Sequence, residues 1–231
     1  SLLFFVFNMA TAQQEISTAY ATQATNMFAP LDKNRIPHKV LLDYGFEYTN
    51  LKAYNGTLSD STVVDVPTLK HIYNTIFSSR VTSATTGFIN PNNFDSNWKN
   101  RTAGTITVSG LYYKYNAFIN DAINLGKVNF VNNQFQDKFV SGVWQNPYQE
   151  FQAFAMAPAI SKYEGLSFTV KIPSTIFYSN YQSLVQSIQI DFGNGAGYVT
   201  VPFNQNVTIS YATEGVKTWK YKLNLTNGTS L

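Results

Sequence analysis

The chain of 231 residues contains no cysteine. This absence excludes disulfide bonds, zinc sites built from thiolates and cysteine nucleophiles. Charged residues are also scarce, at 13% of the chain, which is about half the usual share. The 16 lysines and arginines are scattered singly, without a basic run. We therefore predict no nucleic-acid-binding surface.

Histidine is nearly absent as well, because only His38 and His71 are present. A serine hydrolase needs a serine, a histidine and an acid within reach of one another, and the chain has no Gly-x-Ser-x-Gly motif. We interpret His38 as a loop residue and His71 as a solvated helix residue. The sequence therefore predicts no catalytic residues in this segment.

The chain has no apolar run of the roughly 20 residues that a membrane-spanning helix needs. The short apolar run from Leu2 to Phe7 precedes the small residues Ala10 and Ala12, which is typical of the end of a signal peptide. We expect residues 1–12 to be a signal-peptide remnant and 13–34 a linker or loosely docked arm. The protein is then secreted or held at a cell surface, with no membrane span.

Aromatic residues are abundant at 16%, and together with Thr and Asn they favour β-sheets. We predict a β-rich domain over 35–152 with one helix near 66–79, capped by Asp65 and with Pro67 in its first turn. Residues 113–123 fit a strand or a helix, and we favour strand, turn and strand. Short alternating segments predict an antiparallel β-sandwich over 155–231. The expected fold class is mainly β.

The glycines from Gly193 to Gly197 resemble a phosphate-binding loop, but both flanking segments read as strands and no helix follows. A hairpin turn is the better interpretation, with glycine supplying positive φ. Asp191 and Asn194 are candidate calcium ligands, although two side-chain ligands make a weak site. The favoured alternative is that Asp191 accepts amide hydrogen bonds across the turn.

The motif Asp191-Phe192-Gly193-Asn194-Gly195, the later Tyr211 and the alternating strand 217–226 resemble the polycystic-kidney-disease (PKD) type β-sandwich. Asn194 stands where that family has a second Asp, and Ile190 stands where it has a Trp. The resemblance covers about 155–231. It implies one further strand after 226–229, so we expect the sandwich to lack its last strand within this chain.

The chain also resembles the N-terminal regions of large bacterial proteins exported by the type IX secretion pathway, in the stretches LLDYG, WQNPY and IDFGNGAGY. Some of those proteins carry a downstream α/β-hydrolase domain. This resemblance implies a non-catalytic extracellular module that acts as a spacer, adhesion or interaction surface. It leaves open an alternative, the accessory front of a secreted hydrolase. The expected partners are downstream domains, a polysaccharide or a cell-surface protein.

A second alternative is a carbohydrate-binding module, which stacks sugars on exposed aromatic rings. The candidate rings are Trp98, Trp144 and Tyr148, whereas Trp219 lies in an alternating strand and is expected in the core. Carboxylates in apolar surroundings could also form a glycosidase pair. The favoured interpretation is that they satisfy backbone amides at turns. These carboxylates are Asp43, Asp121, Asp137, Glu150 and Asp191.

Overall fold

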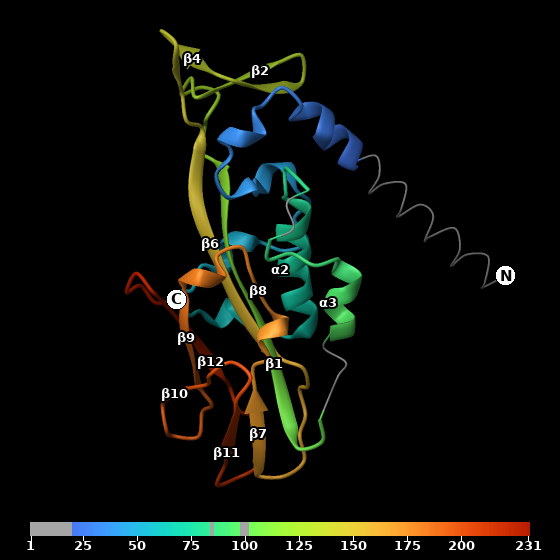
Figure 1. The fold of residues 1–231 in the computed structure, drawn as a ribbon, viewed down its shortest axis with the longest axis vertical. Helices are drawn as coiled ribbons and strands as arrows, with labels where there is room; N and C mark the ends of the chain where they lie inside the picture. The colour runs from blue at the N-terminus through green and yellow to red at the C-terminus, as the bar shows by residue number, and fades with distance from the viewer. Residues whose placement is uncertain (1–19, 84–85, 98–101) are drawn as a thin grey trace, which may run out of the picture.

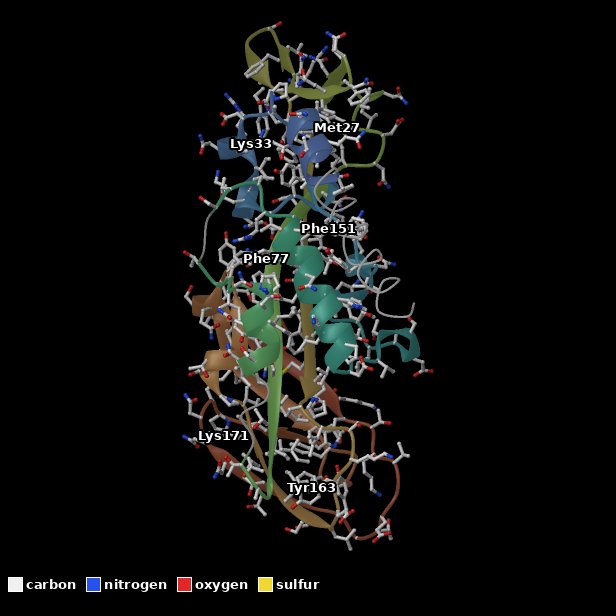
Figure 2. The ribbon with its side chains drawn as sticks, turned by 90° about the vertical axis from the view of Figure 1, so that its right-hand side faces the viewer. Met27, Lys33, Phe77, Phe151, Tyr163 and Lys171 are labelled. Carbon is white, nitrogen blue, oxygen red and sulfur yellow. The ribbon has the colours of Figure 1, made fainter. Side chains whose placement is uncertain are left out.

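A computed structural model describes residues 20–83, 86–97 and 102–231. The molecule is elongated, and two long strands, β1 (Thr105–Phe118) and β6 (Tyr148–Pro158), run along its length (Figure 1). Met27 and Lys33 lie near one end of the molecule and Tyr163 and Lys171 near the other (Figure 2). The hairpin of β1 and β6 therefore connects the two ends.

The fold is mainly β, with few helices. The helices are a segment at 20–27, α2 (Val66–Ser78) and α3 (Pro91–Asn97). Seven short 3-10 turns accompany them in the described residues: Lys33–Arg35, Pro37–Lys39, Leu42–Tyr44, Leu51–Tyr54, Asp60–Thr62, Ser174–Ile176 and Gln182–Leu184. The shorter strands are β2 (Val128–Val131), β3 (Gln134–Asp137), β4 (Phe139–Val140), β5 (Val143–Trp144), β7 (Ser167–Lys171), β8 (Phe177–Ser179), β9 (Val185–Asp191), β10 (Tyr198–Thr200), β11 (Asn206–Ser210) and β12 (Lys220–Leu225).

The strand β1 organises the main sheet, whose order is β11-β7-β1-β6. One edge of β1 pairs antiparallel with β6 along eleven positions, from Val108↔Pro158 to Phe118↔Tyr148. Its other edge pairs in parallel with β7 and then with β8. The sheet is therefore mixed rather than antiparallel as predicted. The sequence did not indicate the parallel pairs because β1 lies outside residues 155–231, the segment predicted to form one sandwich.

Both faces of the β1–β6 hairpin are covered, which explains why Leu111, Tyr112 and Tyr113 are all fully buried. Side chains on alternate positions of a strand point to opposite faces. Leu111 and Tyr113 pack against α2 and α3, together with the small residues Ala153, Ala155 and Ala157 of β6. Tyr112 faces the other way, into a second core.

That second core is shared by the main sheet and a three-stranded sheet of order β10-β9-β12. The main sheet contributes Val108 and Val170, and the smaller sheet contributes Ile190 and Leu223. The strand β6 crosses the boundary expected between 152 and 155, and β1 lies in both cores. One continuous hairpin thus links the two regions that the sequence suggested were separate.

The helix α2 forms where the sequence predicted it. The Asp65 side chain accepts a hydrogen bond from Thr68 N at 2.8 Å, and Pro67 lies in the first turn. Leu69, Ile72 and Ile76 recur on one face and are fully buried. Of the strand, turn and strand predicted for 113–123, the first strand and the turn are confirmed, since β1 ends at Phe118 and a turn follows; the next strand, β2, begins only at Val128.

Other segments differ from expectation. Residues 20–27 are helical, and Phe28 and Leu31 are buried in a third core, so this part of the expected arm is docked. The helix α3 occupies Pro91–Asn97, where clustered Asn, Pro and Asp residues suggest a loop. Residues 229–231 already pair with β12, as shown by the hydrogen bonds between Leu223 and Leu231 at 2.9 Å. The expected signal-peptide remnant at 1–12 lies outside the described residues.

Candidate functional site

Exposed apolar side chains gather at one end of the molecule. Of the 15 large apolar residues that are exposed in the described residues, seven lie between 123 and 143. We call these seven the apolar tip: Ile123, Leu125, Phe130, Val131, Phe139, Val140 and Val143. They belong to the turn after β1 and to the hairpins β2–β3 and β4–β5, which lie at the upper end of the molecule in Figure 1. Gathered exposed apolar side chains are a feature of interaction sites, so the apolar tip is a candidate site.

Two tight turns build the apolar tip. Asn132 and Asn133 both have positive φ between β2 and β3, and so do Ser141 and Gly142 between β4 and β5. Two consecutive positive φ angles characterise the type I′ turn, whose twist matches that of paired strands. The stretch KVNFVNNQF at 127–135 indicates a further strand or a hairpin, and the structure has the hairpin β2–β3 there, whereas the sequence did not predict the hairpin β4–β5. The Ser141-Gly142 dipeptide between two apolar pairs was the available signal.

The base of the apolar tip is held by polar contacts. One carboxylate oxygen of Asp137 accepts a hydrogen bond from the indole Nε1 of Trp144, and the other accepts from Asp32 N, both at 2.9 Å. The guanidinium of Arg35 lies over the rings of Phe139 and Trp144, 5.1 and 5.4 Å from their centroids. The tip is thus attached to the segment around 32–35 and is not a loose loop.

Two of the predicted sugar-stacking residues, Trp144 and Tyr148, lie side by side, with ring centroids 6.2 Å apart. Tyr148 is 6% exposed, and Phe118 stacks on it with ring centroids 5.6 Å apart, so it offers no open face to a ligand. Trp144 is half-buried and supports the apolar tip. Trp98 lies outside the described residues. Trp219 packs against the second core, as predicted, and stacks on Phe168.

The segment 193–197 forms the predicted turn between β9 and β10, with positive φ at Gly193, Gly195 and Gly197. Asp191 Oδ1 accepts a hydrogen bond from Gly193 N at 2.9 Å, and Asn194 Oδ1 accepts from Ala196 N at 3.2 Å. The favoured interpretation of Asp191 is therefore confirmed. Among the described residues, no group of three or more His, Asp or Glu side chains could hold a metal ion.

Three of the other acidic residues singled out also accept hydrogen bonds from this chain. Asp43 Oδ2 accepts from Phe118 N at 2.8 Å, and Asp121 Oδ1 accepts from the amide of Asn124 at 2.6 Å. Asp137 anchors the apolar tip. The structure thus gives these carboxylates hydrogen-bond donors from this chain instead of pairing them with one another.

A polar cluster that the sequence did not predict joins three distant segments. His38 lies 2.7 Å through Nε2 from Glu150 Oε2 and 2.7 Å through Nδ1 from the Tyr181 hydroxyl. Lys114 Nζ donates to Glu150 Oε1 at 2.8 Å. We call these four residues the clasp. His38 and the following Lys39 both have positive φ, at 59° and 57°, a conformation that is uncommon for residues other than glycine.

The charges of the clasp stabilise one another. Partial burial raises the pKa of Glu150, but hydrogen bonds from Lys114 and His38 outweigh it and leave that pKa below its usual value. The hydrogen bond to Glu150 raises the pKa of Lys114. Both ring nitrogens of His38 have partners in this chain, the hydroxyl of Tyr181 and the carboxylate of Glu150. The clasp therefore works as a structural connection between the 36–39 segment, the hairpin and Tyr181.

A second exposed surface consists of aromatic rings along α2. Tyr20, Phe46 and Tyr48 are 37%, 44% and 49% exposed, with successive ring centroids 5.3 and 4.9 Å apart. The ring of His71 stacks on Tyr48 at 6.5 Å. We call these four residues the aromatic row. His71 is exposed, as expected for a solvated helix residue. The two histidines lie in different places, because His71 contacts Tyr48 and His38 belongs to the clasp.

None of the helices in the described parts of the chain is long and apolar enough to cross a membrane. Comparison with known proteins gives no relative from which a function could be transferred. No protein-family model matches the chain, and no curated protein and no solved structure is significantly similar to it.

Proposed function

We propose that the chain is a non-catalytic extracellular module that provides an interaction surface within a larger exported bacterial protein. The observation that carries the proposal is the apolar tip, where seven exposed apolar side chains lie within 21 positions, 123–143. Leaving these side chains in water is unfavourable by about 25 cal/mol per Å² of apolar surface. Covering them with a partner recovers that free energy.

The shape of the molecule supports a role as a spacer that presents this surface. The β1–β6 hairpin runs the length of the molecule (Figure 1), and its two faces lie in different cores. A continuous hairpin packed on both faces resists bending better than two domains joined by a linker. The apolar tip lies at the end of this rigid body, where a partner can reach it.

We also propose that residues 155–231 form a PKD-like unit. Support comes from the hairpin at Asp191–Gly195 and from Tyr211, whose hydroxyl donates to the carbonyl of Phe192 at 2.7 Å and accepts from Trp219 Nε1 at 2.8 Å. The export part of the proposal is supported by the apolar run from Leu2 to Phe7 and the small residues that follow it.

Site-specific photo-crosslinking in an exporting bacterium tests the interaction. A photoreactive amino acid replaces Ser141 at the apolar tip or, as a control, Thr213, which is exposed in a loop following β11. We expect a discrete adduct from position 141 that Val140→Ser/Val143→Ser abolishes, and no adduct from position 213. The mass of the adduct distinguishes a downstream domain of the same protein from a cell-surface protein. The same adducts from both positions, or none from position 141, would refute the proposal.

A further inference from the structure

The aromatic row and the apolar tip differ in chemistry, and the difference points to different ligands. The tip is mostly aliphatic, whereas every member of the row carries a ring. Aliphatic side chains suit another apolar protein surface. Exposed aromatic faces carry a negative π-surface that attracts polarised C–H groups. The C–H faces of sugar rings have this character.

The row is held rigidly by α2. Phe46 N donates to Ser78 Oγ at 2.9 Å, and Tyr48 N donates to Thr75 Oγ1 at 3.0 Å. The hydroxyl of Tyr20 donates to the carbonyl of Gly45, which joins the helical segment at 20–27 to the segment that carries Phe46 and Tyr48. A backbone fixed in this way loses little conformational freedom when a ligand binds, which favours affinity.

Carboxylates accompany the rings. Partial burial raises the pKa of Tyr20, and the negative charges of Glu47 and Asp43 raise it further. Glu47 lies between Phe46 and Tyr48 and is exposed. Its carboxylate has no hydrogen-bond or ion-pair partner among the described residues, so it is free to accept bonds from ligand hydroxyls. The same charges repel anionic ligands.

We infer that the aromatic row is a binding site for a neutral polysaccharide. Sugar rings stack on Tyr48 and Phe46, the two most exposed rings, while Glu47 accepts hydrogen bonds from sugar hydroxyls. This site is separate from the apolar tip, and it uses none of the residues that the sequence suggested for sugar stacking.

Affinity electrophoresis of the full chain in gels containing single polysaccharides tests the inference. The panel contains the neutral polymers hydroxyethylcellulose, xylan, laminarin and glycol chitin, and the acidic polymers alginate and polygalacturonate. We expect retardation by at least one neutral polymer and by neither acidic one. Tyr48→Ala and Phe46→Ala should each weaken binding up to about tenfold, as expected for the loss of one aromatic contact. Glu47→Gln should weaken it less.

Tyr163→Ala is the matched control, because Tyr163 is as exposed as Tyr20, at 37%, and lies near the end of the molecule that is remote from Met27 (Figure 2). It should bind as the unchanged chain does, and so should Val140→Ser/Val143→Ser. Unchanged thermal midpoints confirm that each variant folds. Absence of retardation by every neutral polymer would overturn the inference, as would equal weakening by Tyr163→Ala. Neither result bears on the crosslinking at the apolar tip.

Discussion

The imidazole of His38 and the carboxylate of Glu150 lie 2.7 Å apart although 112 positions separate them in the sequence. The contact ties the 36–39 segment to the start of β6, beside Lys114 of β1. On this face of the hairpin, Tyr112 belongs to the second core, while Tyr148 belongs to the third core. The clasp is therefore a polar connection between two hydrophobic cores.

Replacing Glu150 should change the pH dependence of stability. Folding lowers the pKa of Glu150, so its contribution is complete above the ordinary value of 4.5 and is lost as the pH falls through the folded value. Folding raises the pKa of Lys114, so that contribution is complete below 10.5 and is lost as the pH rises through the folded value. Glu150→Gln should lower the thermal midpoint between these limits and have little effect outside them.

The expected decrease is small, because the Glu150 side chain is 52% exposed and water screens the pair. Glu164→Gln provides the control, since Glu164 is an exposed carboxylate without a partner in the described part of the chain. Thermal midpoints measured across the pH range should be parallel for the unchanged chain and this control. A Glu150→Gln curve parallel to both would show that the clasp carries no charge-dependent stability.

Removing the hydroxyl of Tyr73 should destabilise the helix-covered core. This hydroxyl donates to the carbonyl of Ile89 and accepts from Ile89 N, both at 2.7 Å, while the ring is fully buried. Tyr73→Phe leaves two backbone groups without a partner and should cost about 1–3 kcal/mol in denaturant unfolding. Tyr221→Phe should be neutral or stabilising, because the buried Tyr221 hydroxyl has no partner among the described residues. Similar losses in both variants would contradict this account.

Tyr73 also predicts a response to alkaline pH. Burial raises the pKa of Tyr73 to about 12 from 10.0. The contribution to stability is complete below 10.0 and is lost as the pH rises through the folded value, because the unfolded chain ionises first. Between these two pH values, the unchanged chain should lose more stability than Tyr73→Phe. Urea unfolding at several alkaline pH values measures the difference.

Two glycines should resist substitution for different reasons. Gly45 has a φ of −88°, which any residue adopts, but an added Cβ would lie 2.7 Å from Ser79 Cα and 2.8 Å from Ser79 N. Gly142 has a φ of +78° and open space around it. Gly45→Ala should cost about 1–3 kcal/mol through overpacking, and Gly142→Ala roughly 1 kcal/mol through backbone strain. A greater loss in Gly142→Ala, measured by denaturant unfolding, would contradict the steric account of Gly45.

The turn between β9 and β10 gives a sharper test of strain. Gly195 has a φ of +88° with nothing within 4 Å of an added Cβ, so Gly195→Val meets only a dihedral cost of about 1–2 kcal/mol. The adjacent Ala196 is exposed and is not among the residues with positive φ. Ala196→Val should therefore leave the free energy of unfolding nearly unchanged. Equal effects of the two substitutions would indicate crowding rather than backbone conformation.

Local features of this protein could be predicted from the sequence because short-range physics controls them. The cap at Asp65 needs only an acceptor placed three residues before Thr68, and the glycines from 193 to 197 adopt positive φ without a partner elsewhere in the chain. The turn after β1 likewise depends on residues that are close together in the sequence. Each of these features is determined by residues within one turn or hairpin.

The functional candidates depended on contacts between distant residues. Phe46 and Tyr48 form a surface with Tyr20 because α2 holds their segment beside it, and no spacing rule indicates that contact. Tyr148 could not be recognised as buried until Phe118 was placed on it.

By itself, the sequence determined the mainly β fold, the helix α2 and the turns, because periodicity and backbone preference act locally. The tertiary structure alone decided that β1 serves both cores, that His38 meets Glu150, and that exposed apolar and aromatic side chains gather on two separate surfaces. These arrangements arise when strands far apart in the sequence pair and pack together, and the free energy of that packing is a property of the whole chain.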